Sequence, residues 1–131
     1  MLDTNACIAV MNRSSSTLVR RLLSEPPEDV VTSVVCAAEL RFGAERSAKR
    51  PDALRALETF LAAVRPMPFD VPCLEPYGRI RARLAATGKP IGPLDTLIAA
   101  HAVSLDLTLV TNNQREFLRV PDLRLDDWSS G

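Results

Sequence analysis

Hydrophobic residues recur along the chain in two patterns: short apolar runs, and longer stretches in which apolar positions are three or four residues apart. The short runs predict strands and the longer stretches predict amphipathic helices. Strands are expected at residues 1–3, 29–32, 67–69, 107–111 and 123–125. Helices are expected at residues 5–12, 15–24, 33–47, 52–64, 72–87, 93–105 and 114–118.

This alternation of strands and helices predicts an α/β fold with a parallel sheet of about four to five strands sandwiched by helices. The 131 residues fit one domain, residues 1–131, and the 47% of hydrophobic residues are sufficient for a core. In sheets of this kind, functional groups gather at the carboxyl ends of strands, near the point where the strand order changes direction. The residues that follow each strand are therefore the candidates for a site.

Composition and charge exclude several classes of protein. Sixteen basic and sixteen acidic residues give a formal net charge of zero, so contact with nucleic acid requires a local patch or a metal ion. No apolar run approaches the roughly 18 residues of a membrane-spanning helix, and no secretory signal is visible. Cys7, Cys36 and Cys73 form no CxxC pair, so we expect reduced, buried cysteines in a cytoplasmic protein.

Polar residues follow the predicted strands. Asp3 comes directly after the first strand, and Glu39 lies in the helix after the second. Asp95 lies in the first turn of a helix that begins after a Gly-Pro pair, while Asn113 and Glu116 follow the run LTLVT. We expect these side chains to meet at the carboxyl edge of the sheet.

Helical spacing places two of the acids among apolar residues. Glu39 shares a face with Val35 and Phe42, and Asp95 shares a face with Ile98, so both faces are expected to point toward the core. Taken alone, Asp95 fits a favourable helix-dipole position, Glu39 fits the solvated edge of its face, and an aspartate after a strand fits a turn or helix cap. Their combination favours a site, because buried carboxylates need a partner or a cation.

The ligand type indicates the cation. Clustered carboxylates without a His or Cys set suit Mg²⁺, with Mn²⁺ as a substitute, rather than zinc. His101 is the only histidine and is interpreted as structural or surface. With Mg²⁺, such a cluster can activate a water and stabilise a phosphodiester transition state, which is nuclease chemistry without a covalent intermediate.

Four segments together resemble the PIN domain, and more narrowly the VapC toxins of bacterial toxin–antitoxin systems. They are LDTN at 2–5, ELRFGAER at 39–46, GKPIGPLDTLIAAHA at 88–102 and LVTNNQREF at 109–117, and the likeness extends to the closing Asp127-Trp128. The resemblance implies a Mg²⁺-dependent endoribonuclease, with tRNA as a candidate substrate. It also implies inhibition by a VapB-type antitoxin and assembly as a homodimer.

The resemblance implies the following catalytic and metal-binding residues: Asp3, Glu39, Asp95, Asn113 and Glu116. Many PIN domains have a further aspartate after the late strand, where this chain has Asn112 and Asn113. Glu116 is therefore expected to supply that carboxylate, and one Mg²⁺ is favoured over two. Asn5 is expected to orient Asp3, and Thr111 to hydrogen-bond the cluster.

Basic residues precede the helix of Asp95 and are predicted to contact RNA phosphates: Arg79, Arg81, Arg83 and Lys89. A solvated helix face is the alternative interpretation for each of them. Aromatic residues make up only 5% of the chain, which favours recognition of RNA shape over base stacking.

Three other hypotheses remain. A phosphatase with a nucleophilic aspartate would carry Asp-x-Asp after the first strand, but Asn5 occupies the second position. A PIN-like interaction module without catalysis and a solitary PIN nuclease in RNA processing are the other two. Because only Met1 and Leu2 precede Asp3, we also expect the natural protein to begin a few residues earlier.

Overall fold

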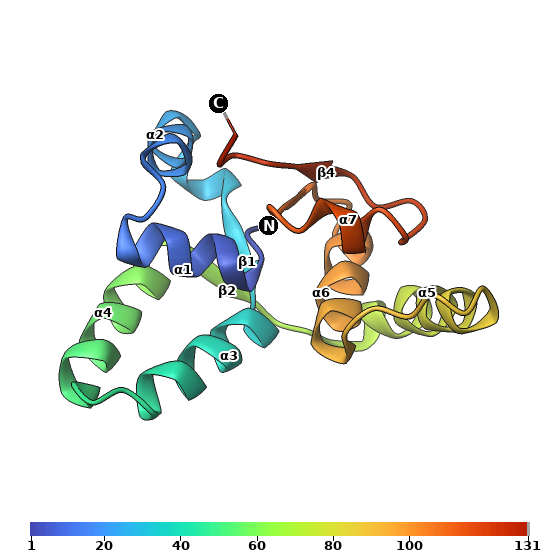
Figure 1. Ribbon diagram of the computed structural model, residues 1–131, viewed down its shortest axis with the longest axis horizontal. Helices are drawn as coiled ribbons and strands as arrows, with labels where there is room; N and C mark the ends of the chain where they lie inside the picture. The colour runs from blue at the N-terminus through green and yellow to red at the C-terminus, as the bar shows by residue number, and fades with distance from the viewer. Residues whose placement is uncertain (131) are drawn as a thin grey trace.

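The computed structural model describes residues 1–130, and Figure 1 shows the arrangement of their elements. The helices are α1 (Thr4–Asn12), α2 (Ser16–Ser24), η1 (Pro27–Asp29), α3 (Val34–Glu45), α4 (Arg50–Ala63), η2 (Val71–Cys73), α5 (Leu74–Ala86), α6 (Pro93–Ser104) and α7 (Gln114–Phe117). The strands are β1 (Val31–Ser33), β2 (Arg65–Met67), β3 (Leu109–Val110) and β4 (Leu125–Asp126). Each expected helix is present, and the expected strands are shorter than predicted or displaced by a few residues.

The sheet is parallel and is joined at its centre by the first residues of the chain. β1 pairs with β2 and β3 pairs with β4, both in parallel. Leu2 forms parallel bridges with Thr32 of β1 and Val110 of β3, which gives the order β2–β1–(residues 1–3)–β3–β4. After the central segment, the chain forms β1 and β2 on one side of it and later β3 and β4 on the other side. The strand order therefore changes direction at Asp3. The predicted parallel α/β sheet is confirmed.

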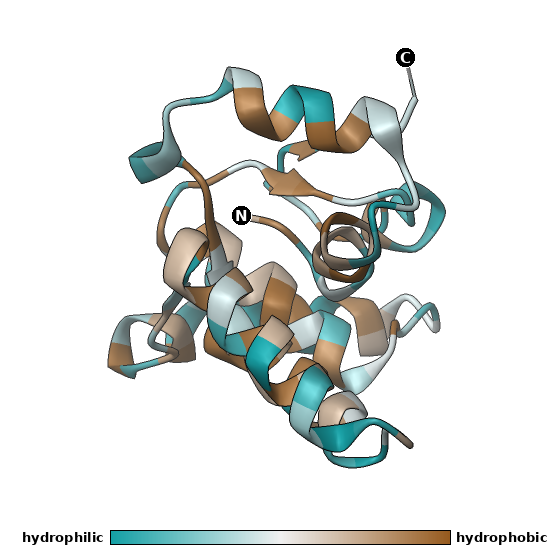
Figure 2. Cartoon of the chain, turned by 90° about the vertical axis from the view of Figure 1, so that its left-hand side faces the viewer, coloured by the Kyte–Doolittle hydropathy of each residue, from teal (hydrophilic) through white to brown (hydrophobic). Residues whose placement is uncertain are grey.

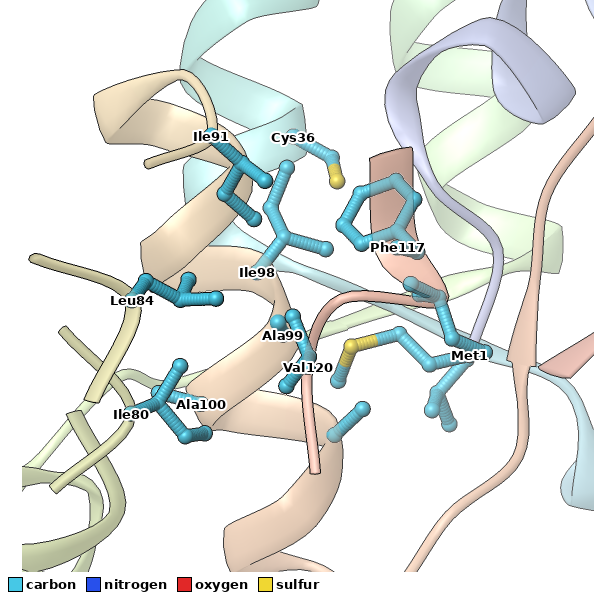
Figure 3. Packing of buried hydrophobic residues seen from close by; sticks show 13 residues of the cluster. Met1, Cys36, Ile80, Leu84, Ile91, Ile98, Ala99, Ala100, Phe117 and Val120 are labelled. Carbon is cyan, nitrogen blue, oxygen red and sulfur yellow. The ribbon is translucent and has the colours of Figure 1, made fainter. Parts of the chain in front are cut away.

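Hydrophobic side chains pack on both sides of this sheet. In Figure 2, α2 along the top turns its hydrophobic side toward the strands and its hydrophilic side outward. Figure 3 shows Ile98 of α6 with Ile80 and Leu84 of α5 on one side and Met1 and Phe117 on the other. α6 is apolar on most of its circumference because it is buried between α5 and the sheet.

One expectation about helix faces is wrong. The face of α3 that carries Glu39 does not point into the core, since Phe42 on that face is 62% exposed. α3 instead buries Cys36, Leu40 and Ala44, which lie at spacings of four on a neighbouring face. Glu39 is half-buried, so specific contacts rather than core packing determine its position.

Other expectations about burial are confirmed. His101 is completely buried, in agreement with the structural interpretation. Cys7, Cys36 and Cys73 are free and buried. None of the helices between residues 1 and 130 has both the length and the apolar character of a membrane-spanning segment.

Candidate functional site

Asp3 lies at the carboxyl end of the central strand and also begins α1. Its backbone N–H donates to the Val110 carbonyl (3.1 Å), and its Oδ1 accepts from the Ala6 N–H (2.8 Å) as the N-cap of the helix. The side chain is only 4% exposed. Burial raises the pKa of Asp3, against an opposing contribution from the Thr111 hydroxyl, and the charge of Glu39 raises it further. Asp3 is therefore both a helix cap and a buried carboxylate whose charge is costly.

A hydroxyl from α1 holds Glu39 beside Asp3. The Thr4 hydroxyl donates to Glu39 Oε1 (2.7 Å) and so connects α1 to the middle of α3. This contact directs the Glu39 carboxylate toward the start of α1, although its helical face is partly solvated. The contact of Thr4 with Glu39 joins residues that are 35 positions apart.

Asp95 and Glu116 form a second part of the cluster around the Gly92 backbone. Gly92 donates its N–H to Glu116 Oε1 (2.8 Å), and the Asn113 amide donates to Glu116 Oε2 (2.7 Å). A Cβ atom on Gly92 would lie 3.5 Å from Asp95 Oδ2 and 3.8 Å from Glu116 Oε1, so both carboxylates approach this one residue closely. Glycine leaves the space between them open.

The electrostatics of this pair reflect two carboxylates held close together. Burial first, and then the charge of Glu116, raise the pKa of Asp95 to about 6. The pKa of Glu116 is lowered, chiefly by the Gly92 N–H, and a proton on Asp95 can be donated to Glu116. Two neighbouring carboxyl groups that share a proton behave in this way. A cation would supply the positive charge that the proton otherwise provides.

The donor set fits a hard divalent cation. The ligands are carboxylate oxygens, which suit Mg²⁺ or Mn²⁺. Across residues 1–130, no three side chains of Asp, Glu, His or Cys are close enough to hold an ion by themselves. Mg²⁺ does not require such a cage, because it keeps several waters and is often bound by one or two carboxylates. One or two of the carboxylates of Asp3, Glu39 and Asp95 would hold it together with water molecules, because these groups lie close enough that, besides burial, the charge of Glu39 raises the pKa of both aspartates.

The remaining predicted site residues lie around this cluster. Thr111 is buried with its hydroxyl near Asp3, as expected, and also accepts from the Asn113 N–H (2.9 Å). The Asn113 side chain contacts Glu116. Asn5 is exposed, and in the part of the chain that the structure describes its amide makes no hydrogen bond to Asp3.

Sequence reasoning missed Asp127, which directly follows β4. Its charge contributes to raising the pKa of Asp3. Ser129 donates to Asp127 Oδ1 through its N–H (2.9 Å) and its hydroxyl (2.5 Å), which keeps the pKa of Asp127 low. The rule that identified Asp3 would have identified Asp127 if it had been applied to the last strand.

The basic residues predicted to bind RNA are all exposed on or just after α5. Arg79 forms ion pairs with Glu75 (3.0 Å) and Asp122 (3.2 Å), and Arg81 donates to the Tyr77 hydroxyl (2.8 Å). Two further residues, Arg83 and Lys89, make no ion pair within residues 1–130. The four side chains are thus accessible, and two of them already have partners.

Comparison with known proteins agrees with this fold. The family model described as "PIN domain" matches residues 1–123. The chain is 40% identical over 129 residues to the "tRNA(fMet)-specific endonuclease VapC" of Shigella flexneri, which covers 98% of this chain and 97% of that protein. It is 36% identical to "Ribonuclease VapC2" of Rickettsia felis, with coverage of 98% and 96%.

Solved structures give the same result. A DNA-bound VapBC from Salmonella typhimurium superposes with a TM-score of 0.93 at 38% identity and covers 98% of this chain and 96% of that one. VapBC2 from Rickettsia felis, bound to a promoter DNA fragment, gives 0.91 at 35% identity, with coverage of 98% and 97%.

A parallel α/β sheet with a carboxylate cluster at its switch point defines a class of domains suited to metal-assisted phosphodiester chemistry. Within that class, the chain belongs to the PIN domain family and, in that family, to the VapC group.

Proposed function

We propose that this chain is the toxin of a type II toxin–antitoxin pair, a single-domain, cytoplasmic, Mg²⁺-dependent endoribonuclease. The observation that carries the proposal is the convergence of Asp3, Glu39 and Asp95 from three separate elements, with the pKa values of two of them raised. Relatives named as VapC endonuclease and ribonuclease support RNA as the substrate, and tRNA is the first substrate to test.

The residues of the chain divide the chemistry between them. A bound Mg²⁺ supplies a water of lowered pKa and offsets negative charge on the phosphate. Thr4 keeps Glu39 directed toward Asp3, so that the ion-binding oxygens are held before substrate arrives. Burial, and next the charge of Glu116, which Gly92 and Asn113 hold in place, raise the pKa of Asp95 to about 6, and a nearby cation would favour its ionised form.

A VapB-type antitoxin is the proposed partner, since the structural relatives are VapBC complexes. A cavity of about 360 Å³ opens between α1, α3 and α4 and is lined by Ile8, Met11 and Leu40, with Glu39 at its border. Phe42, which is exposed, also lies on α3. An apolar antitoxin segment fits this surface, and a basic residue on it would reach the carboxylates. We also propose that the toxin forms a homodimer.

RNA cleavage by the purified, antitoxin-free chain tests the activity. We expect Mg²⁺ or Mn²⁺ to support cleavage of total bacterial RNA, EDTA to abolish it, and Asp3→Asn to abolish it with the fold retained. Intact RNA in the presence of Mn²⁺ would contradict the proposal and favour a non-catalytic interaction module. Cleavage without any antitoxin that binds the protein would favour a solitary RNA-processing nuclease.

A further inference from the structure

A small cavity with polar and apolar walls lies next to Thr111, whose hydroxyl contacts Asp3. Its volume is about 210 Å³, and it lies between α1, the start of α2 and the residues that follow β3 and β4. Its lining includes Asn5, Ser15, Thr111, Asn112, Asp127 and Trp128. Thr111 is the wall shared with the carboxylate cluster, because its hydroxyl also contacts Asp3.

We propose that this cavity binds one nucleobase of the RNA beside the cleaved bond, and that it selects a base with an exocyclic amino group. The inference rests on the proposed ribonuclease function, since it assigns a role to the space next to the acids. Cytosine and adenine carry such an amino group at the edge where uracil and hypoxanthine carry a carbonyl oxygen.

The size of the cavity fits one base. A cavity of about 150 Å³ accommodates a single six-membered ring. At about 210 Å³, this one holds a base but not a dinucleotide. The nucleotides on either side would have to lie outside it, one of them over the carboxylates.

The solvent-exposed side-chain amides at its border fit a base edge. Asn5 and Asn112 are exposed, and within residues 1–130 neither side-chain amide makes a hydrogen bond. Each amide offers donors and an acceptor, the combination by which asparagine reads base edges. The Ser15 hydroxyl already accepts from the Leu18 N–H as the cap of α2 and can still donate its own proton.

The charge of the cavity gives the selectivity. Asp127 is oriented by the two hydrogen bonds from Ser129, and an ionised carboxylate can only accept hydrogen bonds. A phosphate is repelled by Asp127 and by nearby Asp3. The Asp127 carboxylate attracts an amino group at the base edge and repels a carbonyl oxygen at the same position.

The only tryptophan of the chain reports on the cavity. Trp128 lines it, and its indole N–H donates to Asp126 Oδ2 (3.0 Å), which fixes the ring. A ¹⁵N–¹H spectrum of the protein therefore contains one indole signal. The experiment titrates the EDTA-treated full chain with cytidine against uridine, and with adenosine against inosine, and follows that signal.

We expect cytidine to bind at least about 5-fold more tightly than uridine, or adenosine than inosine by the same margin, as expected for one base-edge contact. Asp127→Asn retains the acceptor for Ser129 but removes the charge, and should reduce the preference to about 2-fold or less. Asp122→Asn is the matched control in an exposed turn and should leave the preference unchanged.

Equal binding within both nucleoside pairs, the absence of any shift of the indole signal, or a preference that survives Asp127→Asn would each overturn the inference. The readout is independent of the proposed function because no metal and no cleavage are involved. If RNA is cleaved but the nucleosides are not distinguished, only the base site is wrong. If the nucleosides are distinguished but RNA stays intact, the ribonuclease proposal fails and the base site stands.

Discussion

The two ends of α6 each carry a titratable side chain in a largely apolar helix, and the two have opposite properties. Asp95 lies in the first turn, is half-buried and has a pKa raised to about 6 by burial and by Glu116. His101 lies in the last turn, is fully buried, and has a pKa lowered by burial. Its Nδ1 pairs with the Ser33 hydroxyl (2.8 Å), and its ring stands edge-on to Phe69 at 5.4 Å.

The difference shows that burial of a polar group does not by itself indicate a functional site. His101 is neutral, and it joins α6 to the start of α3 through one hydrogen bond, while its Nε2 has no partner within residues 1–130. Asp95 is surrounded by groups of its own sign, an arrangement that folding alone does not favour. Convergence of like charges, rather than depth in the core, distinguishes the site.

The largest expected effect comes from Asp95→Asn, which tests the functional end of α6. Removing the charge should lower RNA cleavage by more than about 100-fold, because loss of a group that merely supports a metal ligand already costs about 10–100-fold. Single-turnover cleavage of a defined RNA at fixed Mg²⁺ measures the loss. The control is Asp29→Asn, since Asp29 is exposed, and retention of more than a tenth of wild-type activity by Asp95→Asn would remove Asp95 from the site.

The second test addresses the structural end. His101→Ala should lower the free energy of unfolding by about 2–4 kcal/mol, because it leaves a cavity and removes the partner of the Ser33 hydroxyl. Denaturant unfolding measures this value, with Leu94→Ala on the exposed side of α6 as the control. Cleavage per folded molecule should remain within a few-fold of wild type. A loss of cleavage without a loss of stability would show that His101 acts in the site.

Much of this contrast could be predicted from the sequence. Helical and strand periodicity placed the elements, because each buries one regular face. The strand-end rule located Asp3, whereas Asp95 was identified from its position among apolar residues in the first turn of a helix. The expectation that His101 is structural or on the surface followed from its isolation in the sequence, and its burial leaves the structural alternative.

Other parts of the site required the tertiary structure. The contact of Thr4 with Glu39 depends on how α1 crosses α3, which no local pattern encodes. The wrong prediction of a core-facing Glu39 arose because Phe42 was assumed to be buried, whereas periodicity alone does not say which of two apolar faces packs. Glu116 was found from its position after a strand, but its fixation by the Gly92 backbone was not.

A third test examines the hydroxyl that positions Glu39. Thr4→Val removes the hydrogen bond at nearly constant volume and should weaken Mg²⁺ binding by about 10-fold, the lower end expected for a residue that orients a ligand. Thr4→Ser keeps the hydroxyl and should bind Mg²⁺ within about 3-fold of wild type. Isothermal titration of metal into the protein measures both. Equal affinity of the Val and Ser variants would show that Glu39 does not need Thr4.

The smallest expected effect concerns the pH dependence of the metal-free protein, where the two ends of α6 oppose each other. The pKa of Asp95 is raised from 3.8 to about 6, so its protonated form favours folding; this stability is present below pH 4 and is lost as pH rises through 6. The pKa of His101 is lowered, so its contribution is present above its ordinary value of 6.5 and is lost as pH falls below it.

The difference between wild type and Asp95→Asn isolates the acidic end. The full shift would correspond to about 3 kcal/mol, which we reduce to about 1 kcal/mol because Asp95 is half exposed and screened by solvent. In EDTA, Asp95→Asn should therefore be more stable than wild type by about 1 kcal/mol at pH 7 and equal to it at pH 4. Saturating Mg²⁺ should remove or reverse the difference at pH 7, since only wild type gains the full binding energy. A variant less stable than wild type at pH 7 in EDTA would mean that the Asp95 carboxylate is satisfied by contacts within the protein and does not depend on a cation.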